Sequence, residues 1–162
     1  MPDARGAAFY HARAMETPRK PSETAPAGWH EHRLRVRYGE TDQMGVAHHA
    51  NYLLYFEEGR TRLMESLGVS YAEVEASGYG LPVRKVELRY RIPARYDQQL
   101  VVRSRVARVR GASVTFEYRI EDAAGAALLA EGSTELACIR LSSPAREPCL
   151  LPPQLRDRLR VE

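Results

Sequence analysis

The sequence predicts an α+β domain in which one antiparallel sheet of five strands packs against a single long helix. Five segments alternate apolar with charged or polar residues, and this period of two is typical of strands that bury one face and expose the other. One long segment instead places its apolar residues three or four positions apart, as a helix does. The chain has 162 residues, 44% of them hydrophobic, which is enough for one domain with its own core. A sheet packed on a helix gives a two-layer architecture.

One strand precedes the long helix and four follow it. We expect them at residues 32–38, 85–92, 99–110, 114–121 and 127–141. The segment 114–121 is the clearest, because apolar residues fill every second position. Gly132 in the last segment predicts a bulge or bend. An open sheet of this size leaves edges exposed, and pairing with a second copy of the chain would cover one of them.

The long helix is expected at residues 49–67, with Gly68 as its C-terminal stop. Its apolar positions are Tyr52, Leu53, Tyr55, Phe56, Leu63, Met64 and Leu67. This broad apolar surface predicts a helix that is covered on more than one side. A short helical turn is expected at 70–75, and two prolines open a short C-terminal helix that ends near Leu159.

The first 28 residues differ from the rest of the chain. They are rich in Ala, Pro, Arg and Thr, show no apolar periodicity and lack the apolar core of a signal peptide. We therefore expect a disordered tail at 1–28 and one domain at 29–162. Apolar runs are too short to span a bilayer, so a cytoplasmic location is expected.

Charge and cysteine content exclude several classes of protein. A net charge of +3 suits an anionic, nucleotide-bearing substrate but is too small to indicate nucleic-acid binding. The chain also lacks a Gly-rich phosphate loop and the Gly-x-Ser-x-Gly elbow of serine hydrolases. Cys138 and Cys149 do not have CxxC spacing, so we expect reduced thiols rather than a zinc site or a disulfide framework.

The segment 38–52 carries the chemistry. Asp42 lies on a Gly-containing loop, seven residues before His49, where the long helix is expected to begin. A helix start offers unpaired backbone N–H groups and a partial positive charge. A carboxylate beside such donors supplies what acyl-group hydrolysis needs, namely a base or nucleophile and a cradle for a developing oxyanion.

The chain resembles the hotdog-fold thioesterases, specifically the 4-hydroxybenzoyl-CoA thioesterase-like and short acyl-CoA thioesterase branch. The matching residues are Tyr38-x-x-Thr41-Asp42-x-x-Gly45-Val46-x-x-His49-Ala50-x-Tyr52, then Phe56-Glu57-x-x-Arg60-Thr61, then Tyr90-x-x-Pro93-Ala94-x-x-Asp97. These elements occur in the family's order, and the likeness extends from about residue 32 to 141. His48 and Met44 depart from the pattern, which affects the expected shape of the acyl pocket more than the chemistry.

The resemblance implies a five-stranded antiparallel sheet wrapped around a central helix, and a homodimer that often pairs into a dimer of dimers. It implies an acyl-CoA substrate, or an acyl-carrier protein, bound at the dimer interface without a metal or cofactor. Asp42 would be the nucleophile or general base, the backbone N–H of His49 the oxyanion donor and Tyr38 a supporting group. The residues expected to bind substrate are Gly45, Val46, Tyr52, Phe56 and Glu57.

Structural roles compete with these assignments. Asp42 could serve only the turn, since Asp is common there, and Tyr38 could simply fill the core as a strand aromatic. His30 and His32 share a strand face and, with the His48–His49 pair and Asp42, could form a metal site, although the spacing matches no known ligand pattern. Arginines 89, 91, 95, 108 and 110 could bind CoA phosphates, but their alternation favours a solvated strand face.

Two other functions remain open from the sequence. One is a non-catalytic acyl-binding hotdog module, which the presence of Asp42 disfavours. The other is a hotdog hydratase or dehydratase acting on enoyl thioesters, whose Asp–His motif is not found here.

Overall fold

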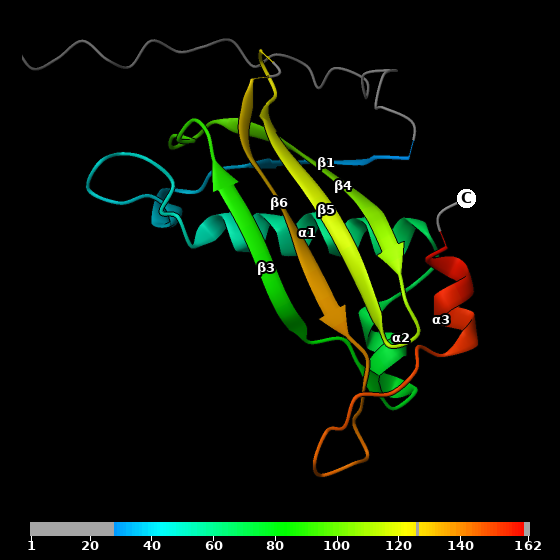
Figure 1. The fold of residues 1–162 in the computed structure, drawn as a ribbon. Coiled ribbons are helices and arrows are strands. Elements are labelled where there is room, and N and C mark those ends of the chain that lie inside the picture. Colours follow the sequence, from blue (N-terminus) through cyan, green and yellow to red (C-terminus); the bar gives the residue numbers. More distant parts are fainter. Residues whose placement is uncertain (1–27, 126, 161–162) are drawn as a thin grey trace, which may run out of the picture.

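The computed structural model describes residues 28–125 and 127–160; most of the expected tail lies outside them. Five strands form one sheet in the order β1-β4-β5-β6-β3, and every neighbouring pair is antiparallel (Figure 1). The strands are β1 (His30–Arg35), β3 (Val83–Tyr90), β4 (Gln99–Val109), β5 (Ser113–Asp122) and β6 (Leu128–Ala137). The predicted fold class is confirmed.

The long helix α1 (Asn51–Ser66) lies across one face of this sheet (Figure 1). Its buried residues are Tyr52, Tyr55, Phe56, Gly59, Arg60, Leu63 and Met64. They meet the inward-facing residues of β4, β5 and β6, and the ring of Phe56 stacks on that of Tyr118 at 4.3 Å. The helix thus buries one broad side in the core while its outer side remains exposed.

The predicted bulge at Gly132 is wrong. Gly132 stays in register with both neighbouring strands, opposite Leu88 on β3 and Tyr118 on β5. A Cβ at this position would collide with the carbonyl oxygen of Glu87 and lie 3.0 Å from Phe56 Cε2. Glycine is needed here because the β3 backbone and the Phe56 side chain of α1 both approach this position closely.

The remaining elements are short. They are η1 (Tyr38–Glu40), α2 (Tyr71–Ala76), β2 (Tyr79–Gly80), β7 (Ile139–Arg140) and α3 (Pro153–Arg158). The first strand ends at Arg35 instead of reaching residue 38, and the last predicted strand is interrupted at Cys138, beyond which β7 pairs with β2. Within the described part of the chain, no helix has the length and apolar character needed to cross a membrane.

A buried cation lies between α1 and the sheet. The Arg60 side chain is only 6% exposed and donates to Tyr71 Oη at 2.7 Å, Tyr118 Oη at 3.3 Å and Thr134 Oγ1 at 3.4 Å. The nearest carboxylate oxygen among the described residues, on Glu57, is 4.0 Å away. Neutral hydroxyl groups therefore provide most of the solvation that this guanidinium loses on burial.

The β3 edge is open. Its inward-facing side chains include Val86 and Tyr90, which remain 42% and 49% exposed, and Ile92 just beyond the strand is 50% exposed. Apolar side chains this exposed are unusual on the edge strand of a sheet.

Candidate active site

The loop that carries Asp42 is a small hairpin at the N-terminal end of α1, drawn in cyan in Figure 1. Thr41 and Ala47 form an antiparallel bridge, and the Asp42 N–H donates to the Val46 carbonyl at 3.0 Å. The Gly45 N–H donates to the Asp42 carbonyl at 2.9 Å, and Gly45 has a φ of 70°, which side chains disfavour. The motif glycine thus makes the turn that presents Asp42.

One oxygen of the Asp42 carboxylate accepts a hydrogen bond from the loop, and the other has no hydrogen-bond partner among the described residues. Oδ1 accepts the Met44 N–H at 2.9 Å, which is the turn role considered as an alternative. No described residue hydrogen-bonds to Oδ2, and the side chain is only half-buried. A carboxylate held through one oxygen can direct the other at water or substrate.

The helix begins at Asn51, two residues later than predicted, and no side chain caps it. His48 N–H donates to the Glu40 carbonyl at 2.8 Å, and Ala50 N–H to His48 Nδ1 at 3.3 Å. Between them, the backbone N–H of His49 has no acceptor among the described residues. Both imidazoles are exposed, with ring centroids 4.1 Å apart. In the part of the chain that the structure describes, the turn leading into α1 thus contains a backbone N–H without an acceptor.

Glu40 is a site residue that the sequence analysis missed. Its side chain is 11% exposed and accepts the Arg37 N–H and the Tyr55 O–H, both at 2.8 Å, while Arg37 Nε lies 2.9 Å away. Its carbonyl accepts from His48 and from the Asn51 side-chain amide. Burial, and next the bond to Glu40, raise the pKa of Tyr55, so the phenol stays protonated as a donor. Glu40 ties the Asp42 loop to the start of α1.

The later part of the family-like pattern packs against this loop. Ala47 N–H donates to the Ala94 carbonyl at 2.8 Å, and Ala94 N–H donates to Tyr52 Oη at 2.9 Å. Tyr90 Oη donates to the His49 carbonyl at 3.0 Å. Segments some forty residues apart in sequence thus converge around the Asp42 hairpin.

Tyr38 lies on the same loop but not in the core. It is 79% exposed, and its ring makes an edge contact with Tyr96 at 5.7 Å between centroids. The alternative of a core-filling strand aromatic is therefore wrong, because the chain has left β1 and turned into η1 before this residue.

The predicted substrate-binding residues fall into two groups. Tyr52 and Phe56 are buried within the chain, at 2% and 0% exposure. Gly45 is exposed and Val46 half-buried on the hairpin, and the Glu57 side chain is 66% exposed on α1. Tyr52 and Phe56 therefore belong to the core beneath this part of the surface, whereas Gly45, Val46 and Glu57 are accessible to a ligand.

An apolar surface continues from this region. Glu58 contacts His32 of β1, whereas Arg60 contacts Thr134 of β6, which fixes how α1 is turned over the sheet. Leu53, 40% exposed, and Glu57 therefore lie on the helix flank nearest β6 and β3. The inward-facing apolar side chains of β3 lie on the same side of the molecule.

His30 and His32 do not join the Asp42 loop. His32 Nε2 hydrogen-bonds to Glu58 Oε1 at 2.8 Å. His30 Nδ1 is buried without a partner, and burial, with the neighbouring His32, lowers the pKa of His30. Among the described residues no three His, Cys, Asp or Glu side chains are grouped to hold a metal ion.

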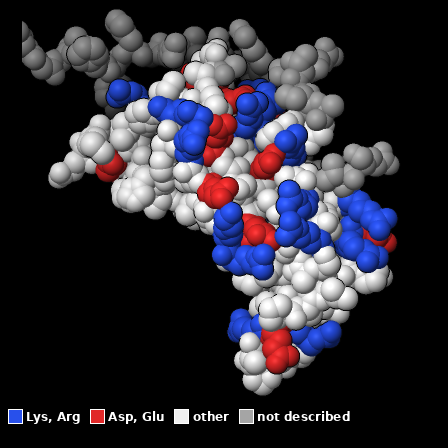
Figure 2. All heavy atoms as spheres, viewed as in Figure 1, with Lys and Arg blue, Asp and Glu red and all other residues white. Residues whose placement is uncertain are grey.

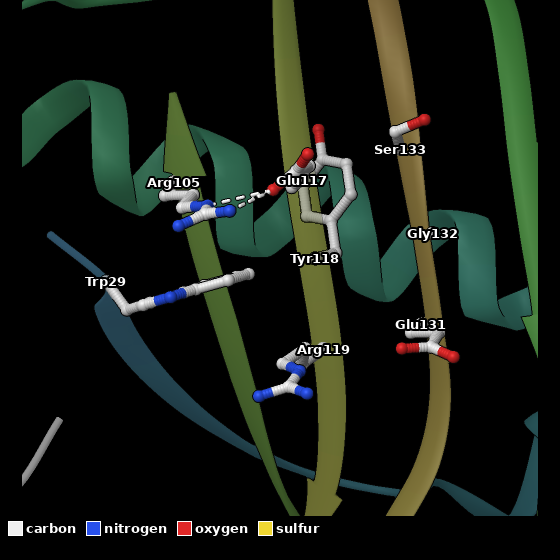
Figure 3. Close-up of a pocket in the computed structure, with 8 residues that line it drawn as sticks. All are labelled: Trp29, Arg105, Glu117, Tyr118, Arg119, Glu131, Gly132 and Ser133. Atoms are coloured by element: carbon white, nitrogen blue, oxygen red, sulfur yellow. Dashed lines mark hydrogen bonds and ion pairs between the residues drawn. The ribbon is translucent and has the colours of Figure 1, made fainter. Parts of the chain in front are cut away.

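The outer face of the sheet, opposite α1, carries charges of both signs (Figure 2). Arg105 pairs with Glu117, and the Trp29 ring packs on the Arg105 guanidinium at 4.6 Å (Figure 3). These residues line a hollow of about 480 Å³ that includes neither Asp42 nor His49. Arg91 is paired with Glu131. Cross-strand ion pairs therefore cover this face, as expected for a face of the sheet that is exposed to solvent.

A single-layer antiparallel sheet around one helix, with an acidic hairpin at the helix start, defines the hotdog class of thioesterases. The family model described as the thioesterase-like superfamily matches residues 36–159. The chain is 39% identical over 92 residues to "Putative acyl-CoA thioesterase YneP" of Bacillus subtilis, covering 57% of this chain and 67% of that protein. It is 33% identical over 106 residues to "Acyl-CoA thioester hydrolase YbgC" of Escherichia coli, covering 65% and 78%.

Among solved structures, the DHNA-CoA thioesterase of Staphylococcus aureus superposes with a TM-score of 0.72 at 32% identity, covering 76% of this chain and 80% of that one. The chain belongs to the thioesterase-like superfamily, has the hotdog fold and is a thioester hydrolase.

Proposed function

We propose that this hydrolase cleaves acyl-CoA thioesters to a carboxylic acid and free CoA, with Asp42 as nucleophile or general base. One observation carries the proposal: a half-buried carboxylate and the His49 backbone N–H occupy the same short loop, and among the described residues neither the Asp42 Oδ2 atom nor this N–H has a hydrogen-bond partner. The names of YneP, YbgC and the Staphylococcus enzyme support a CoA-linked substrate.

In the proposed reaction the His49 N–H donates to the thioester carbonyl oxygen and stabilises the negative charge that develops there. Asp42 either attacks the carbonyl carbon or removes a proton from the attacking water. The C–S bond breaks and the CoA thiolate leaves. If Asp42 is the nucleophile, water then hydrolyses the acyl anhydride on Asp42 and releases the carboxylic acid. The proposal also assigns supporting roles to the exposed imidazole of His49 and to the Tyr38 hydroxyl, which belong to the same loop region.

We further propose that the working unit is a homodimer joined through the β3 edge. Exposed apolar side chains on β3, including Val86 and Tyr90, would be covered by the same strand of a second copy, which would also satisfy the unpaired edge. The acyl group would then lie between the Leu53–Glu57 flank of α1 and the partner subunit. An acyl-carrier protein thioester is the alternative substrate.

The decisive experiment compares Asp42→Asn with Asp122→Asn. Both aspartates accept a backbone N–H two residues ahead, Asp42 from Met44 at 2.9 Å and Asp122 from Ala124 at 3.3 Å. Asn keeps an acceptor oxygen, so the turns survive while the charge is lost. Asp42→Asn should lower kcat on acyl-CoA by roughly 10²–10³-fold or more, a loss like that of an oxyanion donor. The control variant should retain wild-type turnover.

Near-normal hydrolysis by Asp42→Asn would refute the catalytic role. The dimer is tested separately by light scattering on Val86→Lys and on Leu150→Lys, whose leucine is 73% exposed but away from the β3 edge. Only the first substitution should yield a monomer. A wild-type chain that stays monomeric at high concentration would refute the interface. Parallel assays with acyl-CoA and acyl-carrier substrates identify the thiol carrier.

A further inference from the structure

Cys138 and Cys149 lie directly opposite each other across a short antiparallel pairing. Cys149 N–H donates to the Cys138 carbonyl at 2.8 Å, and Ile139 forms a bridge with Pro148 one residue further along. Their sulfur atoms are 3.6 Å apart. Both thiols are free, and neither belongs to the active-site region.

The expected backbone spacing at this position lies within the range that a disulfide spans. Residues facing each other at a hydrogen-bonded antiparallel position have Cα atoms about 5.5 Å apart, within the range of about 4.4–6.8 Å that disulfides span. Because an S–S bond is about 2.0 Å long, the two sulfur atoms need to approach by roughly 1.6 Å. Small side-chain rotations supply a movement of that size.

The two thiols differ in access. Cys138 is fully buried, and burial, followed by the neighbouring Cys149 thiol, raises its pKa to about 12. Cys149 is half-buried and in partial contact with solvent. An external oxidant therefore reaches Cys149 first, and Cys138 lies within reach to complete the bond.

We propose that Cys138 and Cys149 form a modification site that closes to an intramolecular disulfide under a low-molecular-weight disulfide such as oxidised glutathione. The Cys149 thiolate attacks one sulfur of the oxidant, forming a mixed disulfide and releasing one thiol. Cys138 then attacks Cys149 Sγ and gives its proton to the departing sulfur, which leaves as the second small thiol. The protein loses two protons and two electrons, and the oxidant gains them as it becomes two small thiols.

The cross-link would tie the end of β6 to the segment that leads into α3. In Figure 1 this end of the molecule is remote from the cyan hairpin that carries Asp42. Closing the disulfide should therefore stabilise the C-terminal part of the fold and leave thioester hydrolysis unchanged. A constrained loop of this size predicts a rise in melting temperature of roughly 5–10 °C.

The full-length protein is incubated in glutathione buffers of increasing redox potential and quenched in acid. Free thiols are then alkylated, and the mass of the intact protein is measured by mass spectrometry. The wild type should pass from two alkylated thiols to none, with a mass about 2 Da below that of the reduced chain. A peptide map should show Cys138 joined to Cys149, and reductant should reverse the change. Cys138→Ser should stop at one glutathione adduct on Cys149, and Cys149→Ser should resist oxidation.

Three results would overturn the proposal. They are two alkylatable thiols in the wild type at the most oxidising potential, a persistent glutathione adduct on the wild type, and cross-linking between chains instead of within one. The first two readouts need no variant, so they hold even if Cys138→Ser folds poorly.

Discussion

Replacing Glu40 by Gln tests whether a buried carboxylate holds the Asp42 hairpin in place. The side chain accepts from the Arg37 N–H and from the Tyr55 O–H, each at 2.8 Å. Both donors reach the same oxygen, Oε2, so the amide oxygen of Gln can keep the two bonds but without the charge. A hydrogen bond to a charged group contributes about 1.5–3 kcal/mol and one between neutral groups about 0.5–1.5 kcal/mol, so each bond weakens by about 1 kcal/mol. The contact with Arg37 Nε adds little, because the Arg37 side chain is 76% exposed.

The expected destabilisation by Glu40→Gln is therefore about 2 kcal/mol, or roughly 4–8 °C in melting temperature. Circular dichroism during thermal unfolding measures it. Glu117→Gln is the matched control, since that carboxylate pairs with Arg105 while 40% exposed and should change the free energy of unfolding by less than about 1 kcal/mol. Because the Glu40 carbonyl binds His48 and Asn51, kcat should also fall while KM stays close to the wild-type value.

A double-mutant cycle with Tyr55→Phe tests whether the destabilisation arises from the hydrogen bond between Glu40 and Tyr55. Glu40→Gln removes the charge that strengthens this buried bond and Tyr55→Phe removes the bond itself, so their destabilisations should be less than additive. The reasoning is refuted if Glu40→Gln melts within about 2 °C of the Glu117→Gln control, or if the two substitutions add fully.

Three further outcomes are expected. Gly132→Ala should destabilise the fold by about 1–3 kcal/mol in a urea titration, because the added methyl group meets the Glu87 carbonyl and the Phe56 ring. Arg60→Lys should cost about 1–3 kcal/mol in the same titration, since one ammonium cannot replace a guanidinium fork that reaches three hydroxyls. The lowered pKa of His30 means that the unfolded chain binds this proton more readily, so its contribution to stability is present above about pH 6.5 and is lost as the pH falls. His30→Gln should therefore show a smaller drop in melting temperature between pH 7.5 and 5.5 than the wild type, and an equal drop would contradict the assignment.

Elements with a strong period were predictable. The segment 114–121 corresponds to β5, Ser113–Asp122, and the helix expected at 49–67 corresponds to α1, Asn51–Ser66. The first strand was overextended because alternation continues to Tyr38, although the chain turns into η1 where Glu40 is buried. The strands β2 and β7 have two residues each and are too short to show a period.

The candidate site divides in the same way. Asp42 and His49 were identifiable from residue type, spacing and resemblance, and their catalytic roles remain predictions. Glu40 was not identifiable, because a carboxylate in a charged loop gives no sign of burial. Its burial depends on Tyr55, fifteen residues away, and only the tertiary structure brings that phenol to it.

The hairpin around Asp42 is held mainly by main-chain bonds, from Asp42 to Val46, from Ala47 to Ala94 and from His48 to Glu40. Its two most outward side chains, Gln43 and Met44, take no part in that framework except through the Met44 backbone N–H. The geometry of the turn therefore does not depend on which residues occupy these two positions. Randomising both positions together should therefore yield libraries rich in folded protein.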